Sequence, residues 1–129
     1  MRQTGFTLIE LMVVMTIIAI LAGIAIPSYR QHVIRSHRSS AQAEMMSLAN
    51  REQQFLIANR SFADKAELTA NGYAPPPEVT DFYSWDVMIP GAAPPVFIIT
   101  LTPIGSQAKD GALTLDSRGN RTPVEKWQK

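Results

Sequence analysis

The longest apolar stretch of the sequence lies at its start. Residues 11–26 contain no charged side chain, and the apolar character begins at Phe6 and stops at Pro27. As an α-helix, residues 6–26 would extend roughly 31 Å, about the thickness of the hydrocarbon core of a bilayer. The pattern predicts a membrane-spanning helical segment over residues 6–27.

Beyond Pro27 the hydrophobic positions follow a helical period. Residues 28–58 contain neither Gly nor Pro, and their apolar positions are spaced by seven, four, three and seven. These positions are Ile34, Ala41, Met45, Leu48 and Phe55. We expect this face to pack on a sheet, with the charged residues mostly outside it: Arg35, Arg38, Glu44, Arg51 and Glu52.

Gly23 and Pro27 stand between these two helical patterns. Proline removes one intrahelical hydrogen bond and clashes with the preceding turn, and glycine adds local freedom. We therefore predict a kink at Gly23 and Pro27 in a helix that continues beyond them. The alternative is that the helix ends at Pro27.

The periodicity fails over residues 59–81. Turn signals accumulate there, including Asn71-Gly72 and three consecutive prolines at 75–77. This segment is predicted as a long loop with one helical turn near residues 64–68. Phe62 and Tyr73 are expected to pack as peripheral core residues that hold the loop down.

Strand patterns occupy residues 82–129. Four segments alternate or are rich in β-branched residues: 83–89, 96–102, 112–116 and 121–124. Short connections make neighbours antiparallel, and residues 96–102 are predicted as a central strand. The predicted fold class is α+β, with a long kinked N-terminal helix packed on an antiparallel sheet of about four strands.

Glu10 is the anomaly of the apolar segment. A carboxylate inside a membrane costs about 2.5–3.5 kcal/mol at the bilayer centre, so it calls for a partner. Cleavage after Gly5 would give Phe6 an α-amino group four residues before Glu10, on the same helix face. That amine, from the same or a neighbouring chain, would neutralise the carboxylate.

The residues Gly5-Phe6-Thr7-Leu8-Ile9-Glu10, with the apolar run and Pro27, closely resemble the N-terminus of type IV pilins and pseudopilins. The resemblance implies that a prepilin peptidase removes a cytoplasmic leader, residues 1–5, and that Phe6 becomes N-methylated. It also implies that Glu10 supports addition of the subunit to a filament. Two other interpretations are a secretory signal cleaved after Ala25 and a plain single-span anchor.

The flank after the apolar run is basic, with Arg30, Arg35, Arg38, His32 and His37. The positive-inside rule would place this flank in the cytoplasm, whereas the resemblance places residues 28–129 outside it as an exported head domain. The patch is interpreted as lipid headgroup contact, as DNA phosphate contact or as a solvated face that pairs with carboxylates such as Glu44. The histidine spacing does not indicate a metal site.

Residues 102–107, 110–111, 113–116 and Gly119 also resemble the C-terminal half of minor type IVa pilins of the PilE kind. Such relatives often carry cysteines near positions equivalent to Asp110 and Lys126, but this chain has none, so another interaction must fasten its C-terminal region. Asp110 and Asp116 are interpreted as turn residues in preference to calcium ligands. Neither a catalytic motif nor a cofactor site is apparent, so an enzyme is not predicted.

The net charge is +1 and falls to zero once Arg2 leaves with the leader, so nucleic acid binding is not indicated by charge. The predicted function is a structural subunit of a type IV pilus, more specifically a minor pilin. Its expected partners are prepilin peptidase, other pilin subunits, the inner-membrane pilus assembly machinery and, before assembly, membrane lipid. The alternatives are a type II secretion pseudopilin and a DNA-uptake or adhesion subunit that would use the turn from Arg118 to Arg121 and the C-terminal lysines.

Overall fold

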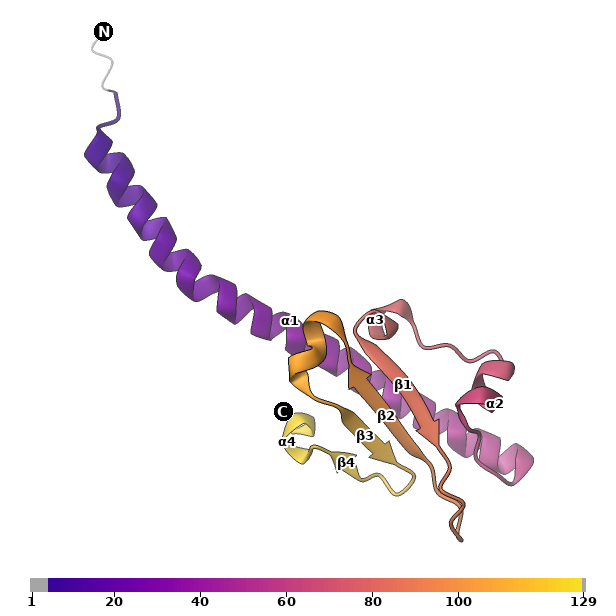
Figure 1. The fold of residues 1–129 in the computed structure, drawn as a ribbon. Helices are drawn as coiled ribbons and strands as arrows, with labels where there is room; N and C mark the ends of the chain where they lie inside the picture. Colours follow the sequence, from indigo (N-terminus) through magenta and orange to yellow (C-terminus); the bar gives the residue numbers. More distant parts are fainter. Residues whose placement is uncertain (1–4, 129) are drawn as a thin grey trace. The chain divides into compact units, whose positions relative to one another are not determined.

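The computed structural model describes residues 5–128 and contains one long helix, four short helical segments and a four-stranded antiparallel sheet (Figure 1). The chain forms two compact units, one ending at Arg35 and one beginning at Ser36. Helix α1, Leu8–Asn59, contributes to both and includes Pro27, so the helix does not end at the proline. A kink at Gly23 and Pro27 remains a prediction.

The first unit is the apolar part of α1. The large apolar side chains from Leu8 to Ile26 are all exposed; Leu8 is 76% and Ile24 70% exposed. Judged by length and composition, this helix is able to cross a membrane. An apolar surface of this kind is stable only where lipid or protein covers it.

The second unit has its own core, formed between α1 and the sheet. Ala41, Met45 and Leu48 are buried as predicted, and Phe55 is partly buried against the same cluster. Phe62 and Tyr73 also join the core, which confirms their predicted role. The predicted α+β architecture is therefore observed.

The sheet has the order β1-β2-β3-β4. The strands are β1, Tyr83–Met88; β2, Ile98–Pro103; β3, Leu113–Asp116; and β4, Arg121–Thr122. β2 pairs with strands on both sides, as expected of a central strand, with Val87 opposite Ile99 and Ile99 opposite Leu115. Alternation along β2 and β3 buries Ile99, Leu101, Leu113 and Leu115 toward α1.

Short helices occupy several connections. The predicted loop at 59–81 contains α2, Lys65–Ala70, where the single helical turn was expected, and also α3, Pro77–Thr80, which the sequence did not predict. The proline run was interpreted as a turn, but proline at the first helical position is compatible with a helix because no hydrogen bond is lost there. A 3₁₀-helix, η1, Gly105–Asp110, joins β2 to β3, and α4, Val124–Trp127, follows β4.

Glu52 lies on the buried face of α1, so its predicted place among the charged residues outside that face is wrong. It lies four residues after Leu48, on the apolar face, and is completely buried. One carboxylate oxygen accepts a hydrogen bond from the Ala63 N–H at 2.9 Å, and the other has no hydrogen-bond partner among residues 5–128. Burial raises the pKa of Glu52, and the nearby charges of Glu67 and Asp64 act in the same direction.

Glu52→Gln is therefore expected to stabilise the protein at neutral pH, by on the order of 1 kcal/mol. A carboxyl group whose pKa is raised in the folded state contributes its full stabilisation of the fold at pH values below its unfolded pKa. This contribution is lost as the pH rises through the pKa of the folded state. The amide keeps an oxygen for Ala63 without the buried charge. Denaturant unfolding of the full chain at neutral pH and near pH 4 measures the effect, which should shrink at the lower pH. The exposed Glu125→Gln serves as control, and an equal gain there would contradict the explanation.

Candidate functional site

Thr7 and Glu10 form a capping box at the start of α1. The Thr7 N–H and hydroxyl donate to the same Glu10 oxygen at 2.8 and 2.7 Å, and the Glu10 N–H donates to Thr7 Oγ1 at 3.3 Å. This pairing satisfies amide groups that have no partner within the helix. The sequence reasoning missed it, although Thr-x-x-Glu before an apolar run is its ordinary signal. The carboxylate is thereby held close to the start of the helix.

Gly5 and Phe6 precede this box in a segment without regular structure. Phe6 is 87% exposed, and no atom lies within 4 Å of the position that a Gly5 side chain would take. Their peptide bond is thus open to a peptidase. Leader residues 1–4 lie outside the described residues. Cleavage at Gly5 and methylation at Phe6 stay predictions.

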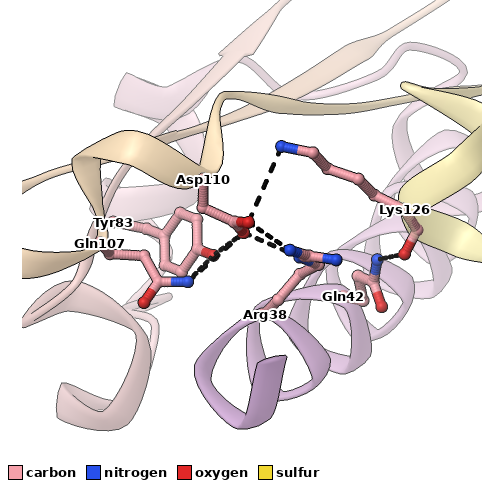
Figure 2. A network of polar contacts seen from close by, with 6 residues as sticks. All are labelled: Arg38, Gln42, Tyr83, Gln107, Asp110 and Lys126. Carbon is pink, nitrogen blue, oxygen red and sulfur yellow. Dashed lines mark hydrogen bonds and ion pairs between the residues drawn. The ribbon is translucent and has the colours of Figure 1, made fainter. Parts of the chain in front are cut away.

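A second polar cluster lies in the head and joins α1, η1 and α4 (Figure 2). Arg38 binds Asp110 with both ends of its guanidinium; its Nε lies 2.8 Å from Asp110 Oδ2, and its second nitrogen pairs with Oδ1. The Lys126 ammonium lies 3.8 Å from Oδ1. The Lys126 carbonyl accepts a 2.8 Å hydrogen bond from the Gln42 side chain. We call these four residues the Asp110 cluster.

The Asp110 cluster sets two cations against one carboxylate. Asp110 is nearly buried, which opposes its ionisation, but Arg38 and Lys126 outweigh that cost and the pKa of Asp110 is lowered. The bond to Asp110 raises the pKa of Arg38. Tyr83, whose hydroxyl accepts from Gln107 at 2.9 Å, has its pKa raised to about 12, chiefly by burial. Through the hydrogen bond between Gln42 and Lys126, the cluster fastens α4 to α1. This is the region in which related pilins often carry cysteines and this chain has none.

Arg38 and Asp110 were both interpreted differently from the sequence. Arg38 is not on a solvated face, and Asp110 is more than a turn residue, because each is the other's charge partner. Two cations already occupy the Asp110 carboxylate, which argues against calcium there. Within residues 5–128 no group of three or more potential ligands for a metal ion is found. His37 stacks on Phe82 with ring centroids 3.7 Å apart.

The β3–β4 turn presents two exposed arginines. Asp116 ends β3, and one of its oxygens accepts from the backbone N–H groups of Arg118 and Asn120, each at 2.9 Å, so its side chain orders the turn as a turn residue would. Arg118 is exposed, and the Arg121 guanidinium lies 5.2 Å from the ring centre of Trp127. The turn is thus ordered by its own carboxylate, and its positive charges face solvent.

Comparison with known proteins defines the class. The solved structure of a type IV pilin from Shewanella oneidensis matches with a TM-score of 0.53 and 23% identity, over 70% of this chain and 92% of that one, which shows the fold. The major pilin PilA of Myxococcus xanthus is 40% identical over 74 residues, and a fimbrial protein of Moraxella nonliquefaciens is 42% identical over 74. These matches cover 57% and 54% of this chain but only 33% and 46% of the relatives' own lengths. The fold and the N-terminal segment define a type IV pilin.

The family follows from two further matches. Residues 1–26 match the prokaryotic N-terminal methylation motif, and residues 27–115 match the family described as "Type IV minor pilin ComP, DNA uptake sequence receptor". The chain belongs to this minor pilin family. As a pilin it is a structural subunit and not an enzyme, in agreement with the prediction.

Proposed function

We propose that the chain is a minor subunit of a type IV pilus, processed by a prepilin peptidase between Gly5 and Phe6. Before assembly it is held in the inner membrane by residues 6–27, with residues 28–129 on the periplasmic side. The observation that carries the proposal is the exposed apolar part of α1, which lies within the match to the methylation motif over residues 1–26. In a filament, neighbouring subunits would replace lipid around this surface.

N-terminal sequencing and mass measurement of the protein from its own cells test this processing. The mature chain is expected to begin at Phe6 and to carry one methyl group. A chain that begins at Met1 or at Ile26 would instead indicate an uncleaved anchor or a secretory signal. Deletion of the gene should reduce piliation; loss of protein export with normal pili would favour a secretion pseudopilin.

A second candidate function is DNA binding by the head. The description of the family supports it, and the ordered β3–β4 turn supplies two solvent-facing cations, Arg118 and Arg121. Arginine suits phosphate because its planar guanidinium matches two oxygens at once. With a net charge near zero, such binding would depend on this local turn and not on the overall charge.

Arg118→Gln and Arg121→Gln are each expected to weaken DNA binding by the full-length protein and to lower its salt dependence. Each lost phosphate contact should reduce the slope of log affinity against log salt by about 0.9. Fluorescence anisotropy with double-stranded DNA over a salt series measures both quantities. Arg60→Gln, which removes another exposed arginine of the head, should leave the slope unchanged. Equal effects of all three substitutions would rule out the turn as the contact.

A further inference from the structure

Arg30 and Arg35 carry positive charges that no carboxylate neutralises within the described chain. Both are exposed on α1, and neither forms an ion pair with any residue from 5 to 128. Residues 11–43 contain neither Asp nor Glu. Arg38, only three residues further on, is by contrast paired with Asp110. The two unpaired arginines are therefore available to an external anion.

The two arginines lie on different sides of the helix. This placement favours lipid phosphates that surround the helix over DNA phosphates along one side of it. At about 100° per residue, Arg30 and Arg35 point about 140° apart around α1, and His32, three residues before Arg35, lies on the same side as Arg35. A DNA duplex would touch one side of a helix, whereas headgroups surround a helix that crosses them. Tyr29, 70% exposed, adds the kind of amphipathic ring that is enriched at membrane interfaces.

Arg30 and Arg35 also conflict with the positive-inside rule, because their flank is proposed to lie outside the cytoplasm. The leader offers only Arg2, while this flank carries Arg30 and Arg35 and is proposed to be outside the cytoplasm. Positive residues on a translocated flank disfavour that orientation. Their presence within nine residues of the last apolar position, Ile26, thus needs a compensating role at the membrane surface.

We propose that Tyr29, Arg30 and Arg35 form a headgroup belt that binds the phosphates of anionic phospholipids at the periplasmic face of the inner membrane. The belt fixes the depth of the apolar helix and retains the subunit before assembly; it rests on the proposed membrane-anchored stage. A basic residue near an anionic surface contributes about 1 kcal/mol, or roughly fivefold in binding. Two arginines should therefore give a preference of about 25-fold for anionic membranes.

The test uses the full-length protein, moved from a neutral detergent into vesicles of phosphatidylcholine alone or with phosphatidylglycerol, at low and high salt. Flotation then gives the partition of the protein into each kind of vesicle. The wild type is expected to prefer the anionic vesicles, and high salt should weaken this preference. Arg30→Gln/Arg35→Gln should lose most of it, and the matched charge change Arg51→Gln/Arg60→Gln, at two exposed arginines of the head, should keep it.

The outcomes separate the belt from the proposed anchor. Failure of the wild type to enter neutral vesicles would overturn membrane anchoring, and the belt with it. Normal entry without a preference for anionic lipid, or an equal loss in both double variants, would overturn the belt alone. If Arg30→Gln/Arg35→Gln instead abolished binding of double-stranded DNA and left the lipid preference intact, the flank would be a nucleic acid surface, which also contradicts the belt.

Discussion

A Glu10→Val variant is expected to be cleaved after Gly5 at the normal level and yet to be nearly absent from filaments. Glu10 is the only acidic residue among positions 1–43, so no other carboxylate of this segment can meet the amino terminus of a neighbouring subunit. A hydrogen bond to a charged group is worth about 1.5–3 kcal/mol, which corresponds to at least about a tenfold loss of incorporation. Immunoblots of sheared filaments against membranes measure the ratio.

Two matched variants separate charge from helix capping. Glu10→Gln keeps an oxygen for the Thr7 N–H and hydroxyl but removes the charge, whereas Thr7→Val removes the hydroxyl and keeps the charge. We expect Glu10→Gln to fail in assembly like valine and Thr7→Val to assemble nearly normally. Normal incorporation of Glu10→Gln would show that the capping box, and not the charge, is what assembly requires.

Periodicity explains why the main elements were predictable. Ala41, Met45 and Leu48 recur at helical spacing, and Ile99 and Leu101 alternate at strand spacing, so each pattern admits one secondary structure. The observed strands begin or end within two residues of the predicted segments 83–89, 96–102, 112–116 and 121–124. Local signals of this kind need no knowledge of the tertiary fold.

Long-range charge pairing was not predictable in the same way. Arg38 and Asp110 are 72 residues apart, and nothing in either local sequence identifies the partner. Glu52 shows the opposite failure, because its polarity suggested exposure although its spacing from Leu48 placed it on the apolar face. In such a case the period was the better guide than the side chain's polarity. The Thr7–Glu10 capping box was local and could have been predicted.

Arg38→Met is expected to lower the free energy of unfolding by about 3 kcal/mol at neutral pH, since it leaves the nearly buried Asp110 carboxylate without its main partner. Loss of one partner of a buried ion pair usually costs about 3–5 kcal/mol, and we expect the lower value because Lys126 remains near Asp110. Denaturant unfolding of the full chain, followed by the fluorescence of tryptophan, measures it; Trp127 lies in α4 and reports on the fastened segment.

The pH dependence distinguishes a charge effect from a packing effect. Because the folded pKa of Asp110 is lowered, its pairing stabilises above the ordinary aspartate pKa of about 3.9 and is lost as pH falls through the folded value. The penalty of Arg38→Met should therefore shrink in acid. Asp110→Asn combined with Arg38→Met should cost less than the two single changes together, because no uncompensated carboxylate then remains. Strict additivity would mean that Arg38 and Asp110 do not act as a pair, and another interaction would have to hold η1 on α1.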